Sequence, residues 1–180
     1  VLLGGGLGLW FFFGGSSSSV AHEHLPKGCD VVARTDFEGL LKVDAIKQHV
    51  LPVLDTKAKS GKDRGKLIKF LVTAKLNPKK DIREIAVCVA KVDPTNKKPD
   101  TLVIVGGHLV PGAVIKAIKE HAKAGTAKGV KIGGMPGVQI TATPTAYIAQ
   151  AKDGALLISN SLALIKAAGK TSSNHKSEYQ

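Results

Sequence analysis

The most metal-like cluster of this chain is a pair of closely spaced histidines, and its two cysteines could form a disulfide. His22 and His24 flank Glu23, and in an extended chain both imidazoles would point to the same side. Two nitrogen ligands do not complete a zinc site, and the pair lacks the i, i+4 spacing of an HExxH helix. We therefore expect a flexible polar linker here, with no metal or other cofactor. The alternative is a metal site that a partner completes.

Cys29 and Cys88 are the only cysteines of the chain, and no CxxC motif occurs. This argues against structural zinc and against thioredoxin-type chemistry. If the strands that contain them are neighbours, the two cysteines could form one disulfide in an oxidising compartment. The alternative is a pair of buried thiols that pack as small apolar groups.

Glycine-rich and acidic motifs give little support for catalysis. Residues 61–66 (GKDRGK) resemble a phosphate loop, but they have one residue too few between the glycines and no Ser or Thr after the lysine. Asp36 and Glu38 adjoin a predicted helix start, where acids favour the helix dipole. No GxSxG nucleophile motif is present. We expect a non-enzymatic protein with no specific small-molecule substrate; the alternative is an enzyme of unknown reaction around residues 106–108 (GGH).

The charge balance predicts attraction to polyanions. Lys and Arg total 26 against 14 for Asp and Glu, which gives a formal net charge of +12. Lysine, a solvated point charge, greatly outnumbers arginine, and only 4% of residues are aromatic, so base-specific or stacking recognition is disfavoured. Basic residues are dense over 42–80, where binding to nucleic acid, anionic lipid or glycan would be salt-sensitive. The alternative is a solvated helix face. The candidate residues are Lys57, Lys59, Lys62, Arg64, Lys66 and Lys69.

The first thirteen residues carry no charge. As a helix they would span about 20 Å, which is short for a bilayer core that needs about 20 residues. We expect the outer end of a membrane anchor, or a helix through which subunits associate; the alternatives are the apolar part of a signal peptide and a Gly-rich insertion segment. The residues expected to contact a membrane or a neighbouring subunit are Leu2, Leu3, Leu7, Leu9, Trp10, Phe11, Phe12 and Phe13.

The rest of the chain predicts an α+β domain. Gly and Ser at 14–19 separate the apolar segment from it. We expect an apolar anchor or assembly helix at 1–15, a flexible linker at 16–26, the α+β domain at 27–169 and a polar tail at 170–180.

Hydrophobic periodicity and turn residues locate the elements of this domain. Strands are expected at 29–35, 85–92, 102–105, 138–143, 145–151 and 155–159, and helices at 37–55, 67–76, from Pro111 to a cap at Gly125, and at 162–168. Residues 93–100 read as a hairpin loop, 129–137 as a Gly-rich connection, and Asp153-Gly154 as a tight turn. This order fits a mostly antiparallel sheet with helices packed on one face, plus the N-terminal apolar helix.

Two stretches carry a resemblance to a family. They are residues 30–36 (DVVARTD), followed by a helix that starts near Phe37, and residues 153–160 (DGALLISN), which lead into a helix at Leu162. Both resemble uncharacterised bacterial exported proteins with an N-terminal membrane anchor and an α+β domain. The resemblance covers the layout of residues 26–169. It implies a location outside the cytoplasm and a non-enzymatic role, and it carries no catalytic residues.

Together these features predict a non-enzymatic exported subunit. Its residues 1–15 would anchor it to a membrane or build it into a protein assembly or filament, and its domain would face the periplasm or the cell surface. The expected partners are therefore a membrane or neighbouring protein subunits. A Lys-rich polyanion-binding module is the second hypothesis.

Overall fold

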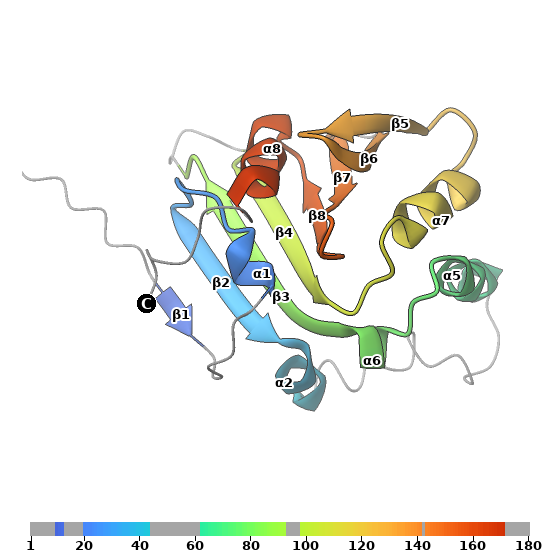
Figure 1. The fold of residues 1–180 in the computed structure, drawn as a ribbon, viewed down its shortest axis with the longest axis horizontal. Helices are drawn as coiled ribbons and strands as arrows, with labels where there is room; N and C mark the ends of the chain where they lie inside the picture. The colour runs from blue at the N-terminus through green and yellow to red at the C-terminus, as the bar shows by residue number, and fades with distance from the viewer. Residues whose placement is uncertain (1–9, 13–19, 44–61, 93–97, 142, 172–180) are drawn as a thin grey trace, which may run out of the picture.

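A computed structural model describes the chain over residues 10–12, 20–43, 62–92, 98–141 and 143–171 (Figure 1). In chain order, its elements are β1 (Trp10–Phe12), α1 (Val20–Glu23), β2 (Val31–Asp36), α2 (Phe37–Lys42), α5 (Lys62–Thr73), α6 (Pro78–Asp81), β3 (Ile82–Ala90), β4 (Asp100–Gly107), α7 (Ala113–His121), β5 (Ala127–Ile132), β6 (Met135–Ile140), β7 (Ala146–Gln150), β8 (Leu156–Ser159) and α8 (Leu162–Thr171).

The strands form one sheet in the order β1-β2-β3-β4-β8-β7-β6-β5. β1 runs parallel to β2, and every other neighbouring pair of these strands is antiparallel. The prediction of an α+β fold with a mostly antiparallel sheet is confirmed. β1 and β5 are the two edges of this sheet, so residues 10–12 and the β5 hairpin lie at opposite ends of the strand order.

Alternating side chains build the main core on one face of the central strands. In β3, Ala86, Cys88 and Ala90 are buried, whereas the residues between them are partly exposed. Residues two apart along a strand share a face of the sheet. The register pairs Cys88 with Leu102 and Ala86 with Ile104, and both of these β4 side chains are fully buried.

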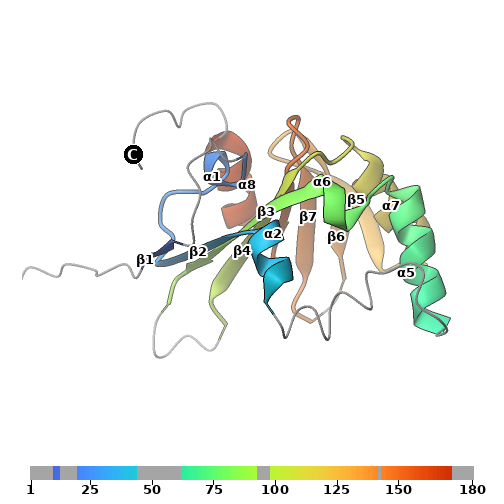
Figure 2. The same ribbon diagram turned by 90° about the horizontal axis from the view of Figure 1, so that it is seen from below.

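Strand β8 shows that helices cover both faces of the sheet. Its Leu157 is fully buried in the core cluster that contains Ile165 of α8, whereas the adjacent Leu156 packs against the cluster of Val114 and Ala117 in α7. Adjacent residues of a strand point to opposite faces. Figure 2 shows α1 and α8 on one side of the sheet and α2 and α5 on the other. The expectation that the helices pack on one face is therefore wrong.

A buried amide fixes the start of α7. Gln150 is almost fully buried, and its Oε1 accepts a hydrogen bond from the N–H of Gly112 at 2.7 Å. Its Nε2 donates to the carbonyl oxygens of Val110 at 3.1 Å and Gly154 at 3.2 Å. Gly112 has a φ of 76°, a left-handed conformation that favours glycine, so the helix begins after it and not at the expected Pro111.

Strand β5 lies where the sequence predicted a Gly-rich connection over 129–137. It pairs with β6 in an antiparallel hairpin from Ala127 opposite Ile140 to Ile132 opposite Met135. Gly133 and Gly134 form the turn, with φ values of 58° and 87°. Glycine adopts such values without steric cost, which suits a two-residue hairpin turn. The glycines of this stretch thus belong to a hairpin. The sequence did not predict strand β5 because this stretch contains few apolar residues.

The N-terminal predictions are tested only in part. Residues 10–12, expected within the apolar helix, form strand β1 opposite residues 32–34 of β2. The rest of that predicted helix lies outside the described residues, so the helix stays a prediction.

The linker predicted at 16–26 is corrected for residues 20–26, which are folded onto the domain, with Ala21, His24 and Leu25 buried. The prediction for 16–19 lies outside the described residues.

The helix expected at 37–55 begins as predicted with α2, and its continuation from 44 also lies outside the described residues. α8 extends to Thr171, two residues into the predicted tail, and 172–180 are not described.

Candidate functional site at the N-terminal attachment

Residues 20–30 attach the N-terminal segment to the domain. They do so through buried apolar side chains, a disulfide and several polar contacts, and we call them the N-terminal attachment. α1 packs on β3 and β4 on the α8 side of the sheet (Figure 1). Ala21 has no exposed surface and Leu25 is 6% exposed, and both belong to the main core cluster. The segment is held because its apolar side chains complete a core that the sheet and α8 leave open on this side.

A disulfide joins this segment to the centre of the sheet. Cys29 and Cys88 are bonded, and their Cα atoms are 5.5 Å apart. Cys88 is fully buried in β3, and its neighbour in the register is Val32 of β2. The bond closes a loop with a sequence separation of 59 residues. On the chain-entropy account, a loop of this length stabilises the fold by about 4 kcal/mol.

His24 lies at the centre of the attachment. Its side chain has no exposed surface, its Nε2 is 2.8 Å from Oδ2 of Asp153, and its Nδ1 is 3.1 Å from the carbonyl oxygen of Ala168. Both neighbouring atoms are acceptors, so an imidazolium, which carries a proton on each nitrogen, can donate to both. His24 therefore links α1 to the turn between β7 and β8 and to α8.

The weak metal candidate formed by His22 and His24 is not supported by this geometry. The chain is helical over 20–23 and not extended, so the expected shared side of the two imidazoles does not arise. Both ring nitrogens of His24 face acceptors of the protein itself. Among the residues that the structure describes, no group of three or more His, Cys, Asp or Glu side chains could hold a metal ion.

Asp153 has two structural roles in the hairpin. Its Oδ1 accepts a hydrogen bond from the N–H of Ala155 at 3.0 Å, which closes the turn that the sequence predicted. Its Oδ2 contacts Nε2 of His24. Gly154, with a φ of 95°, completes the turn. The aspartate is about one third exposed, so water solvates one side of the carboxylate while the other faces the buried imidazole.

Glu84 of β3 is a buried acid that sequence reasoning missed. Its Oε1 accepts a hydrogen bond from the N–H of Ala21 at 2.9 Å, and its Oε2 is 3.3 Å from Nη2 of Arg34 in β2. Gly106 of β4 leaves room for it, because a Cβ at that position would lie 2.7 Å from Oε1. The available signal was an acid directly before the apolar strand predicted at 85–92, with Arg34 in the strand predicted at 29–35 as a possible partner.

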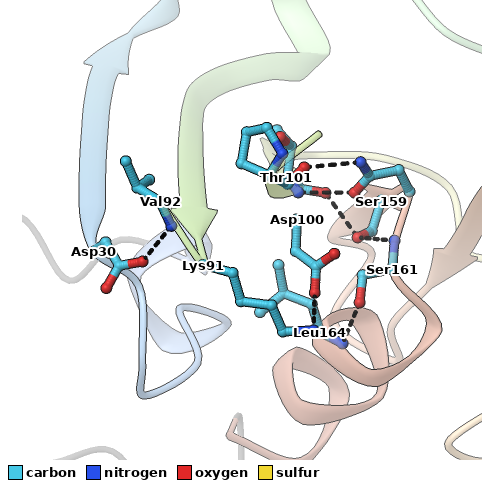
Figure 3. Close-up of polar contacts among 10 residues, drawn as sticks. Asp30, Lys91, Val92, Asp100, Thr101, Ser159, Ser161 and Leu164 are labelled. Carbon is cyan, nitrogen blue, oxygen red and sulfur yellow. Dashed lines mark hydrogen bonds and ion pairs between the residues drawn. The ribbon is translucent and has the colours of Figure 1, made fainter. Parts of the chain in front are cut away.

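A polar network secures the other end of the attachment (Figure 3). Oδ2 of Asp30, next to Cys29, accepts a hydrogen bond from the N–H of Val92 at 2.9 Å. Asp100 is 2.9 Å from Nζ of Lys91, and the hydrogen bond from Lys91 lowers the pKa of this carboxyl, with a smaller contribution from Ser161. Together these contacts hold the end of β3 and the start of β4 beside the starts of β2 and of α8.

Residues 106–108, the place of the alternative enzyme site, form a turn whose backbone contacts α6. The N–H of His108 donates to the carbonyl oxygen of Asp81 at 2.7 Å. A Cβ at Gly107 would lie 1.9 Å from the same oxygen, so the two backbones are in close contact. His108 itself is exposed. The geometry matches a strand-to-helix connection that is pinned to α6.

The remaining predicted residues are described only in part. Trp10, Phe11 and Phe12 are in β1 at the edge beside β2, whereas Leu2, Leu3, Leu7, Leu9 and Phe13 lie outside the described residues. Of the polyanion candidates, Lys66 and Lys69 are exposed on α5, and Lys62 and Arg64 belong to the same helix. Lys57 and Lys59 lie outside the described residues.

Comparison with known proteins gives no relative: no family model, curated protein or solved structure matches the chain. The resemblance to anchored exported proteins therefore stays an expectation. Within the described ranges, no helix has both the length and the apolar character that crossing a bilayer requires.

Proposed function

We propose that the chain is a non-enzymatic exported subunit that is held at a membrane, or within a protein assembly, by its N-terminal apolar segment. The observation that carries this proposal is the attachment itself. Directly after the Gly/Ser stretch, the chain is joined to the central strand β3 by the Cys29–Cys88 disulfide and to α8 and the β7–β8 turn by buried His24. A pulling force on residues 1–19 would thus be transmitted to strand β3 within the sheet.

The pairing of the cysteines supports a location outside the cytoplasm. Structural disulfides form and persist in oxidising compartments, which include the periplasm and the cell surface. The bonded pair comprises both cysteines of the chain. The absence of charge in residues 1–13 supports contact of this segment with lipid or with a neighbouring subunit.

The partners of the buried polar groups support a structural role for the attachment. His24 and Glu84 each bind backbone or side-chain groups of the same domain, and Asp153 is one of the partners of His24. In each case the contact joins segments that are distant in sequence. These groups therefore serve the mechanical connection between the N-terminal segment and the domain.

Deletion of residues 1–19 tests the proposal. We expect the truncated protein to be a monomer that remains in the supernatant, whereas the full chain sediments with membranes or forms multimers. Sedimentation and light scattering after gel filtration measure this. The matched control is the full chain with Cys29→Ser and Cys88→Ser, which keeps the apolar segment and should keep its membrane or multimer behaviour. If the truncated protein retains that behaviour, the proposal is wrong.

A further inference from the structure

The stretch of chain from α7 to β7 is strongly basic. Glu120 is the only acidic residue between Asp100 and Asp153, whereas the same stretch contains six lysines. This sign bias does not follow from the fold, because an ordinary surface intersperses charges of both signs. It concentrates at the β5 end of the sheet, opposite the edge that β1 forms.

Four lysines of this region gather where α7 crosses the edge hairpin. Lys116 and Lys119 are exposed on successive turns of α7, and exposed Lys123 follows the end of the helix. Lys119 reaches over β5, because a Cβ at Gly129 would lie 2.9 Å from its Nζ. Lys131, two residues from Gly129, is on the same side of β5 and is exposed.

We define the α7–β5 basic face as Lys116, Lys119, Lys123 and Lys131. Glu120, the one acid in this part of the described chain, pairs with Lys116 at 3.7 Å through an exposed i, i+4 contact. Exposed pairs of this kind are weak and screened by salt, so Glu120 offsets little of the positive field.

We propose that the α7–β5 basic face binds an acidic polysaccharide. Its charges are all lysines, which attract any anionic group without the bidentate geometry that arginine offers to phosphates and guanines. Neither α7 nor β5 contains Phe, Tyr or Trp, and the imidazole of His121 at the end of α7 contacts Phe70 and Thr73 of α5, so the face lacks a large aromatic platform on which nucleic-acid bases could stack. Sulfate or carboxylate groups spaced along a sugar chain meet these requirements.

Two further observations disfavour a lipid surface as the occupant. The exposed large hydrophobic residues of the described chain lie outside α7 and β5, so no apolar side chain of the face could insert between lipids. The face is also at the β5 edge of the sheet, whereas residues 10–12 form β1 at the other edge, so a membrane that contacts β1 would lie away from it. The choice of a polysaccharide over nucleic acid rests in part on the proposed extracytoplasmic location.

Binding of the detergent-solubilised full chain to heparin, a sulfated polysaccharide, tests the inference. We expect the quadruple variant K116Q/K119Q/K123Q/K131Q to lose at least tenfold in affinity. The control variant K42Q/K79Q/K80Q/K152Q removes the same number of charges from exposed lysines of α2, α6 and the β7–β8 turn, and it should lose less than about threefold. Raising NaCl from about 50 to about 200 mM should weaken wild-type binding roughly 50-fold or more if about four charges are engaged.

Several outcomes overturn the inference. Equal losses in the two quadruple variants would show that net charge alone drives binding. Tighter binding to duplex DNA or to anionic phospholipid vesicles than to heparin, at equal anion concentration, would identify another partner. Absence of heparin binding by the wild type at low salt would show that the α7–β5 basic face is not a binding site for it. If the glutamine variant does not fold, the corresponding Lys→Arg variant should fold and keep the affinity, and its failure to bind would also contradict the inference.

The test is independent of the anchor experiment. Heparin binding is measured on the solubilised full chain, and release by truncation is measured without polysaccharide. If truncation yields a soluble monomer but heparin is not bound, only the inference about the basic face fails.

Discussion

The imidazole of His24, which has no exposed surface, lies 2.8 Å from the carboxylate of Asp153, although 129 residues separate the two in the sequence. The contact joins the first folded segment of the domain to its last hairpin. Because the same imidazole also faces the carbonyl oxygen of Ala168, a single side chain connects α1, the β7–β8 turn and α8.

The first prediction concerns this pair. His24→Leu should lower the free energy of unfolding by about 2–3 kcal/mol and Asp153→Asn by about 1–2 kcal/mol, since each leaves a polar partner unmatched. Asparagine keeps an oxygen that can accept the Ala155 N–H, so the turn itself is spared. In urea unfolding, the double variant should show a coupling of at least about 0.5 kcal/mol. Strictly additive effects would show that the two side chains do not interact.

The second prediction concerns the disulfide. Replacing Cys29 and Cys88 by serine should lower the free energy of unfolding by about 3–4 kcal/mol, because the unfolded chain gains the entropy of an open loop. Guanidinium unfolding of the wild type with and without reductant measures the same effect. Unchanged midpoints under both comparisons would show that the bond is absent from the native protein.

The third prediction uses two glycines in opposite settings. Gly106→Ala should destabilise the domain by about 1–3 kcal/mol, because the new Cβ would lie 2.7 Å from Oε1 of buried Glu84. Gly65→Ala is the matched control: its Cβ would meet nothing within 4 Å, and helix α5 should gain about 0.5–1 kcal/mol. Thermal unfolding of both variants measures these changes. Equal effects at the two positions would contradict the close approach of Glu84 to β4.

The fourth prediction concerns the acid side of the stability profile. The pKa of Asp100 is lowered, first by the hydrogen bond from Lys91. Its ionised form therefore stabilises the fold above the usual carboxyl pKa of 3.8, and that stabilisation is lost as pH falls through the lowered value. Asp100→Asn should cost less than about 1 kcal/mol at pH 6, because Lys91 is largely exposed. The difference from wild type should vanish near pH 2 in denaturant unfolding, and a constant difference at both pH values would exclude the linkage.

Much of the fold could be predicted from local patterns. The β3–β4 hairpin, the start of α2, the α7 helix and the Asp153-Gly154 turn all depend on periodicity or turn chemistry within a few residues. The disulfide was one of two alternatives that the sequence left open for its two cysteines, and the pairing of β2 with β3 brings them together. These are features in which local preference and the final fold agree.

The rest depended on contacts that no local pattern reports. Residues 20–26 looked like a linker because His22, Glu23 and His24 are polar, yet His24 is buried by partners more than a hundred residues away. β5 was concealed because Gly129 carries no side chain and serves as the place where Lys119 crosses the strand. The sequence did not predict that helices cover both faces of the sheet. Strand β8 is apolar on both sides, as Leu156 and Leu157 show, and such a strand does not reveal whether helices or other segments cover each face.

The bridge from Cys29 to Cys88 also changes what cleavage of the backbone can do. Any single cut between these two cysteines would leave a molecule of two chains that remain covalently joined, because the sulfur bridge spans the break. On a non-reducing gel such a nicked protein would keep the mass of the intact one, and only reduction would separate the fragments. A chain cut by a protease within this loop would thus keep its domain attached to its N-terminal segment.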